Sequence, residues 1–168
     1  MQQPVIATFY DHILDISKQE GCSVGEALQE AKKLGVAALE VSCFNTAGRA
    51  EELSHELASA GLGVTTMPAF FSFESDGEVE NRAKGIFEDA KAIGAKTLLV
   101  IPGFIPEGED PEGCTRRMIE RTKRLSELAD REGLALTMED FDNESSPIAT
   151  SRGMLRFMDA VPGLSACF

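Results

Sequence analysis

The chain repeats one unit, an apolar strand-like run followed by an amphipathic helix, and this repetition restricts the fold more than any other feature. Five such passes lie between residues 5 and 161, and a sixth apolar run follows at 164–168. Strands that alternate with helices form parallel sheets. Such a sheet is normally covered by helices on both faces or closed into a barrel. The 168 residues amount to about two-thirds of the roughly 250 residues of a complete (β/α)8 barrel.

Glycine marks the step from helix to strand at four places, directly after Leu34, Ala60, Ile93 and Glu132. Glycine is favoured there because it adopts the left-handed conformation that ends a helix. Ser23, with Glu26 three residues later, has the pattern of a capping box and begins the first expected helix. Together these signals predict about six parallel strands and five helices. The strands are 5–9, 37–42, 63–67, 96–101, 134–138 and 164–168, and the helices are 24–34, 50–60, 79–93, 111–132 and 150–160.

The longer loops, 68–77, 102–111 and 140–149, all follow strands, which is the end where α/β barrels hold their active sites. An open doubly wound sheet fits the same pattern of elements, but it usually carries a glycine-rich first turn for a nucleotide. The turn expected at 10–21 has no GxGxxG or P-loop sequence. We therefore predict α/β class and a partial (β/α)8 TIM barrel. Residues 1–168 are expected to form a single incomplete barrel domain, the N-terminal two-thirds of the fold.

Composition limits the choice of partners and compartment. The formal net charge of −12 repels phosphate backbones, so we expect no nucleic-acid partner. The densest basic group, in helix 111–132, is interleaved with acids and is interpreted as a solvated face with internal ion pairs. No apolar stretch approaches the roughly 20 residues of a membrane span, and no signal peptide is evident. The four cysteines form no CxxC pair, so neither a zinc site nor a disulfide framework is expected. A cytoplasmic location is the expectation.

The strongest local signal for chemistry is Met138-Glu139-Asp140-Phe141-Asp142, which delivers three carboxylates within four residues at the end of an apolar strand. Glu139 is the first polar group there and is placed to point into the barrel mouth. Oxygen ligands of this kind suit Mg²⁺, Mn²⁺ or Zn²⁺. In the alternative interpretation, Asp140 and Asp142 are turn residues and Glu139 is an ordinary carboxylate of the rim.

Other candidates lie near the ends of the first three strands. Glu40 lies within a strand and either pairs with a cation or faces the barrel mouth. His12 is either a ligand or a structural histidine. An aromatic segment after the third strand either lines a substrate wall or packs over the rim; it holds Met67, Phe70, Phe71 and Phe73.

Three segments carry a resemblance to a known family. They are 35–41 (Gly-Val-Ala-Ala-Leu-Glu-Val), 92–100 (Ala-Ile-Gly-Ala-Lys-Thr-Leu-Leu-Val) and 133–142, which ends a strand on Glu139. With these segments the chain resembles the sugar phosphate isomerase/epimerase superfamily, the xylose isomerase-like TIM barrels. The resemblance spans essentially the whole chain, and residues 163–168 look like the start of the family's sixth strand. The resemblance therefore implies a chain truncated after that strand.

The resemblance also implies a divalent metal, Mn, Mg, Zn or Co, at the barrel mouth. Its ligands in the family follow strands 5, 6, 7 and 8, and Glu139 matches the first of them. The other three are expected after Phe168. Many epimerases use a second glutamate about six residues past the first ligand as an acid or base. Here that position holds Ser145, with Glu144 beside it.

The implied reaction is proton abstraction alpha to a carbonyl of a sugar or polyol, with Glu139 as metal ligand and a candidate base. Tyr10, His12, Met67 and Glu144 are expected to contact the substrate. A lyase or dehydratase on the same barrel is one alternative, and a chain that is non-catalytic by itself is another, since one ligand cannot hold a catalytic metal. A homo-oligomer is also expected, because two strand edges would lack neighbours.

Overall fold

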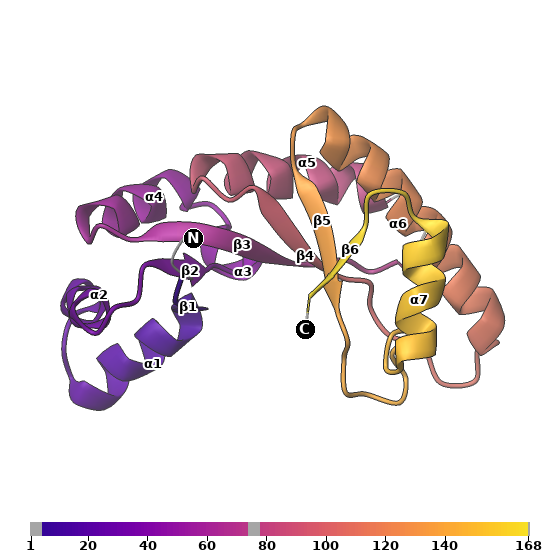
Figure 1. Ribbon diagram of the computed structural model, residues 1–168, viewed down its shortest axis with the longest axis horizontal. Coiled ribbons are helices and arrows are strands. Elements are labelled where there is room, and N and C mark those ends of the chain that lie inside the picture. Colours follow the sequence, from indigo (N-terminus) through magenta and orange to yellow (C-terminus); the bar gives the residue numbers. More distant parts are fainter. Residues whose placement is uncertain (1–4, 74–77, 168) are drawn as a thin grey trace. The chain divides into compact units, whose positions relative to one another are not determined.

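The computed structural model describes residues 5–73 and 78–167. The six strands hydrogen-bond in chain order, β1-β2-β3-β4-β5-β6, and the pairs with a recorded register are all parallel. The sheet is open, and helices alternate with the strands along the chain (Figure 1). The strands are β1 (Ala7–Phe9), β2 (Ala38–Glu40), β3 (Gly63–Phe70), β4 (Thr97–Ile101), β5 (Ala135–Glu139) and β6 (Ser165–Cys167).

The described residues form seven helices, so the expectation of five was wrong. The additional helices are α1, over most of the turn expected at 10–21, and α3, directly after β2. The boundaries of all seven are α1 (Tyr10–Glu20), α2 (Val24–Lys33), α3 (Cys43–Thr46), α4 (Ala50–Ser59), α5 (Glu78–Ala92), α6 (Pro111–Arg131) and α7 (Ser151–Ala160). Within the described parts of the chain, no helix is long and apolar enough to cross a membrane.

The first additional helix lacks the usual signals at its start. Phe9 precedes α1 and offers no side-chain hydrogen bond to cap it, whereas Ser23 caps α2 through the capping box that the sequence predicts. Only Tyr10 and Ile13 of α1 are fully buried, so its apolar stripe is short. The helix ends at Gly21, whose φ of 65° is the left-handed conformation that favours glycine. Its existence depends on the packing of two side chains more than on local sequence.

The third strand is longer than expected, because β3 continues through Pro68 to Phe70. The aromatic segment expected after it therefore begins inside the strand, and the backbone N–H of Phe71 donates to the carbonyl of Ile101. Phe71 and Phe73 are buried and stacked, with ring centroids 5.3 Å apart. This part of the segment packs as core. The rest of the loop expected at 68–77 (residues 74–77) and Phe168 of the expected sixth strand lie outside the described residues.

The residues divide into two compact units, described here one at a time. The N-terminal unit comprises Met1–Pro68 and Asp89–Lys96, and the C-terminal unit comprises Ala69–Glu88 and Thr97–Phe168. In the N-terminal unit, α1 contacts α2, and leucines from three elements are fully buried: Leu28, Leu39, Leu53 and Leu57. The expectation of one domain over residues 1–168 stays a prediction.

In the C-terminal unit, α6 contacts β5 and α7 contacts β6 (Figure 1). The central residues of both strands are buried on both faces of the sheet: Leu98, Leu99 and Val100 of β4, and Leu136, Thr137 and Met138 of β5. Since strand side chains alternate between the two faces of a sheet, Glu139 lies on the opposite face from Met138.

Candidate functional site

The candidate site lies at the carboxyl ends of β5 and β6 in the C-terminal unit. Glu139 is the last residue of β5, and its Cα partner on β6 is Cys167. Aligned residues of parallel neighbours project to the same face, so the carboxylate and the thiol share one face of the sheet. Both residues are exposed. Glu139 therefore follows three buried residues of its strand and is exposed at the strand end. Its orientation into a barrel mouth stays a prediction.

Polar groups below this pair tie the two strands together. The hydroxyl of Thr137 donates to the carbonyl of Ser165 at 3.1 Å, and the hydroxyl of Ser165 donates to the carbonyl of Leu136 at 3.2 Å. These bonds supplement the strand pairing around Thr137 and Ser165, two residues before Glu139 and Cys167. They fix the register that places Glu139 beside Cys167.

The loops after β4 and β5 contact each other next to this rim. The backbone N–H of Ile105 donates to the carbonyl of Ser145 at 2.8 Å. The rings of Phe104 and Phe141 meet edge to face, with centroids 5.5 Å apart, and both side chains are partly exposed. The sequence analysis did not identify Phe104 as a candidate. An aromatic residue directly after the strand-end Pro102-Gly103 turn was the signal that could have indicated it.

Glu144 lies in a tight turn of the loop after β5. The side-chain oxygen of Asn143 accepts hydrogen bonds from the backbone N–H of Ser145 at 2.9 Å and from its hydroxyl at 2.7 Å. The hydroxyl of Ser145 is thus engaged within the turn, whereas Glu144 is exposed. Of these two neighbours, Glu144 is the one that presents an acid or base group to solvent.

Three candidates lie in the N-terminal unit, and their surroundings differ. Tyr10 is only 1% exposed, and its hydroxyl lies 3.5 Å from Oε2 of Glu56. Burial, followed by the charge of Glu56, raises the pKa of Tyr10 above its ordinary value. Met67 is fully buried. His12 is exposed, and its Nδ1 lies 3.1 Å from the hydroxyl of Thr8.

These positions separate accessible candidates from buried ones. The side chains of Tyr10 and Met67 are packed in the core of their unit, and a substrate would reach them only through rearrangement of their neighbours. His12 is accessible next to the end of β1, where Phe9 packs edge-on against its ring at 5.5 Å. Glu40, the last residue of β2, is half-buried and has Phe9 as its Cα partner.

A divalent ion needs several ligand side chains close together. Over residues 5–73 and 78–167, no group of three or more His, Cys, Asp or Glu side chains is gathered closely enough to hold a metal. Glu139 thus offers a single carboxylate from an exposed rim position. These residues do not by themselves make up a complete ion site.

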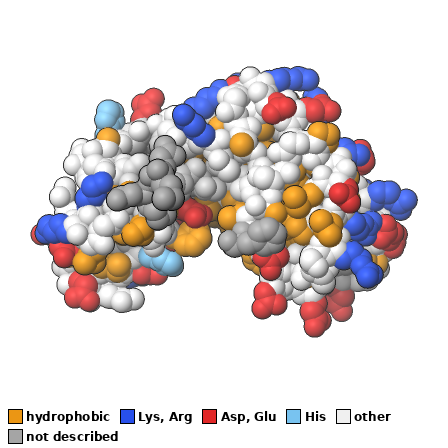
Figure 2. All heavy atoms as spheres, viewed as in Figure 1, with side chains coloured by type: hydrophobic (Ala, Val, Ile, Leu, Met, Phe, Trp, Pro, Cys, Tyr) orange, Lys and Arg blue, Asp and Glu red, His pale blue; other side chains and the backbone are white. Residues whose placement is uncertain are grey.

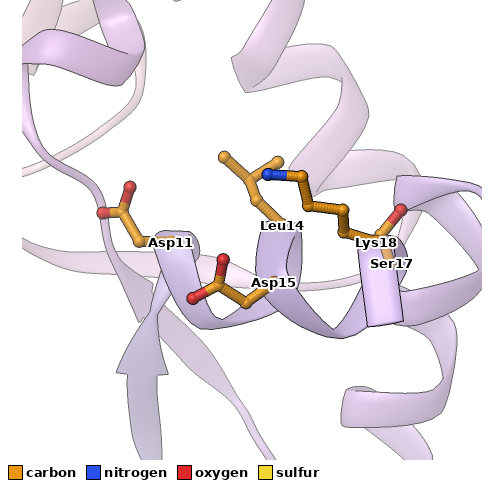
Figure 3. Close-up of a pocket in the computed structure, with 5 residues that line it drawn as sticks. All are labelled: Asp11, Leu14, Asp15, Ser17 and Lys18. Carbon is orange, nitrogen blue, oxygen red and sulfur yellow. The ribbon is translucent and has the colours of Figure 1, made fainter. Parts of the chain in front are cut away.

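A shallow pocket elsewhere is not a candidate for this chemistry. It lies along α1 and is lined by Asp11, Leu14, Asp15, Ser17 and Lys18, all from that one helix (Figure 3). The side-chain amide of Asn45 donates to both carboxylate oxygens of Asp11, at 3.1 and 3.2 Å. The pocket is therefore a groove on the side of a helix, distinct from the carboxyl ends of β5 and β6.

Comparison with known proteins bears on the family and the fold. A family model described as xylose isomerase-like TIM barrel matches residues 28–168. No curated protein is significantly similar to the chain in sequence.

Among solved structures, a probable 3-DHS dehydratase from Bacillus anthracis superposes with a TM-score of 0.74 at 14% identity, covering 97% of this chain and 62% of that one. D-allulose 3-epimerase from Methylomonas sp. gives a TM-score of 0.71 at 12% identity, with 99% and 64% covered. The structure of IOLI protein with a bound zinc atom gives a TM-score of 0.71 at 15% identity, and the match covers 95% of this chain and 61% of that one. At these identities the likeness concerns the fold. The chain spans less than two-thirds of the length of these three structures.

Proposed function

The chain belongs to the xylose isomerase-like TIM-barrel family, and from that premise we propose that it forms part of a metal-dependent sugar isomerase or epimerase. The reaction is proton abstraction alpha to a carbonyl of a sugar or polyol. One observation carries the proposal: Glu139 ends a buried parallel strand with its carboxylate exposed at the rim. That is the end of the sheet where barrels of this kind carry out chemistry.

In this proposal Glu139 is a ligand of a divalent ion, Mn, Mg, Zn or Co, and a candidate for the base. A divalent ion held with the help of Glu139 would supply Lewis-acid chemistry. The zinc atom in the IOLI protein structure supports a metal on this fold. Among the described residues, no group of three or more His, Cys, Asp or Glu side chains is gathered to complete such a site. We accordingly expect the isolated 168-residue chain to bind divalent metal weakly and to turn over no sugar.

Candidate substrate contacts are proposed for each unit by itself. Phe104 and Phe141 offer an apolar wall beside Glu139, and Glu144 offers an exposed carboxylate on the same loop. His12 is the accessible candidate of the N-terminal unit. Tyr10 and Met67 are buried in the core of that unit, and direct contact of either with substrate requires their neighbours to move.

A second candidate function is a lyase or dehydratase. Ser145 stands where many epimerases carry a second acid or base, and its hydroxyl is held by Asn143. Without a carboxylate at that position, no group is assigned to reprotonate the opposite face of the substrate, which an epimerase needs. The structural likeness to a probable 3-DHS dehydratase supports keeping this function open.

The setting of the protein is also a proposal. We propose that the enzyme is cytoplasmic and acts on a small carbohydrate, charged or uncharged. We also propose that it binds neither nucleic acid nor membranes and that it forms a homo-oligomer. The acidic balance of −12 supports the exclusion of nucleic acid. Self-association is supported by β1 and β6, which stand at the two ends of the strand order and so offer edges to a neighbour.

The test uses the full natural polypeptide that carries this sequence. Ketoses and aldoses are incubated with protein stripped by EDTA and then supplied with Mn²⁺, and products are identified by chromatography and mass. Restored isomerisation supports the first function, and loss of water from the substrate supports the second. Glu139→Gln is expected to abolish either reaction while the melting temperature stays unchanged. Glu88→Gln, at an exposed carboxylate on α5, is the matched control and retains activity.

A further inference from the structure

Charge at the proposed site bears on the substrate class. Resting on the proposed function, we infer that the substrate is an uncharged sugar or polyol, and that a phosphorylated or carboxylated analogue is rejected. Three observations on the C-terminal unit carry this inference: the charge of its rim loops, the use already made of its helix N-termini, and the aromatic pair beside Glu139.

The rim loops carry carboxylates and no cations. Loop 102–110 contains three acids and loop 140–150 contains three more, and neither contains a lysine or arginine. All six acids are exposed. Figure 2 shows red side chains without blue neighbours along the edge of this unit where the loop between β5 and α7 lies in Figure 1. These acids are Glu107, Glu109, Asp110, Asp140, Asp142 and Glu144.

The nearest cations belong to the helices, and two of them already pair with acids. Arg117 lies 3.6 Å from Glu109, and the guanidinium of Arg156 donates to both carboxylate oxygens of Glu112. A substrate phosphate at the rim would therefore compete with carboxylates of the chain for these arginines. The exposed Arg152, in the first turn of α7, is the cation next in sequence to loop 140–150 and is tested below.

The N-terminus of α6 is occupied by an anion of the chain itself. Helix N-termini bind phosphate because their first N–H groups point outward and the helix dipole favours negative charge. At α6 the carboxylate of Asp110 accepts from the N–H of Glu112 at 3.2 Å and from the N–H of Gly113 at 2.9 Å. A side-chain carboxylate thus stands where a substrate phosphate would bind.

The N-terminus of α7 is closed in a different way. The hydroxyl of Thr150 accepts from the N–H of Gly153 at 3.2 Å, and the carbonyl of Pro147 packs so closely against Gly153 that a Cβ there would overlap it. Loop 140–150 therefore covers the first turn of this helix. At the start of both helices, oxygens of the chain itself thus already accept from first-turn amide donors that an anion would otherwise use.

These features act together on an incoming ligand. An anion that approaches the rim meets like charges, and their repulsion strengthens as water leaves the site. An uncharged sugar avoids this cost, and its C–H face suits the apolar wall formed by Phe104 and Phe141. Charge thus selects against phosphate and carboxylate groups, while the aromatic pair contributes binding to a neutral ring.

The experiment compares free ketohexoses with their 6-phosphates in the full natural polypeptide loaded with Mn²⁺, measuring affinity and turnover for each pair. For the free sugar that is converted best, its phosphate ester is expected to bind at least tenfold more weakly. Added salt and the charge reversal Asp142→Lys are each expected to reduce this difference in affinity between free sugar and phosphate ester several-fold. Glu88→Lys on α5 is the matched control and leaves the difference in affinity unchanged.

The outcomes separate the two claims. Conversion of a phosphate ester at equal or higher affinity overturns the inference and leaves the proposed function standing. Weaker binding of the ester in Arg152→Ala than in the wild type also overturns it, because the ester would then have a cationic site. If no sugar of either kind is bound or converted by the folded, Mn²⁺-loaded protein, the proposed function fails and the inference fails with it.

Discussion

The backbone N–H of Ile105 donates a hydrogen bond to the carbonyl oxygen of Ser145 at 2.8 Å. This single bond joins the loop after β4 to the loop after β5, 40 positions apart in the chain by their residue numbers. It lies beside the ring contact of Phe104 with Phe141 and next to the strand end that carries Glu139. The two loops therefore form one rim, and substitutions in one are expected to affect the other.

The aromatic pair gives the first prediction. Phe104→Ala and Phe141→Ala are each expected to lower the free energy of unfolding, and the double variant to lose less than the sum of the two. Edge-to-face pairs contribute about 0.5 to 1.5 kcal/mol beyond buried area, and partial exposure of 40% and 37% places this pair near the lower end. Urea unfolding of the four proteins in a double-mutant cycle measures the coupling. Strict additivity would show that the rings do not interact in solution.

The second prediction concerns the close approach of the Pro147 carbonyl to Gly153. Gly153→Ala is expected to destabilise the protein by about 1 to 3 kcal/mol, because the new methyl group meets the backbone carbonyl of Pro147. Gly85→Ala, in α5, is the matched control: a Cβ there meets no atom within 4 Å, and alanine stabilises a helix by up to about 1 kcal/mol relative to glycine. Thermal melts measure both. Equal melting temperatures for the two variants would argue against the close contact.

The third prediction concerns alkaline pH. Tyr10 is the only tyrosine, and the chain has no tryptophan, so tyrosinate absorbance reports a single group. Burial and the nearby charge of Glu56 raise the pKa of Tyr10 above 10.0. A pKa raised on folding contributes stability that is intact below the pKa of the unfolded chain and is lost as pH rises through the folded value. We expect a titration midpoint above 10.0 in the folded protein.

The control for this titration is Glu56→Gln. Removal of that charge is expected to lower the midpoint, yet to leave it above the midpoint of the chain unfolded in urea, because burial is the larger cause. A folded midpoint equal to that of the unfolded chain would show that the Tyr10 hydroxyl is hydrated.

Much of the fold follows from local patterns in the sequence. The capping box of Ser23 and Glu26, which begins α2, is confirmed by the hydrogen bonds between them. Gly61 and Gly133, which the sequence places at helix ends, have positive φ there. These features depend on residues close together in sequence. The parallel α/β sheet is likewise confirmed, since apolar runs that alternate with helices leave few other arrangements.

The elements that the sequence missed depend on contacts between distant residues. α1 starts without a side-chain cap and is held through the burial of Tyr10 and Ile13. β3 continues through Pro68, although proline donates no hydrogen bond, because the strand pairing is resumed beyond it by Phe71 with Ile101. Neither contact is visible in a local pattern.

The candidate site shows the same division. Glu139 at the end of β5 was predictable, because an apolar run that ends in a carboxylate is a local signal. The pairing of Phe104 with Phe141 was not, because it depends on how two loops from different strands meet. The packing of Tyr10 and Met67 in the core was not predictable either. A position near a strand end does not determine whether a side chain points into the core or toward the rim.

The most direct test of the central claim follows a proton at Glu139. The full natural polypeptide, loaded with Mn²⁺, is incubated with its sugar in deuterated water, and deuterium at the carbon next to the carbonyl is measured by NMR. The wild type is expected to incorporate solvent deuterium, and Glu139→Gln to do so at least a hundredfold more slowly, consistent with the contribution of about 10² to 10⁴ from general acid–base groups. Exchange at the wild-type rate in Glu139→Gln would contradict the account.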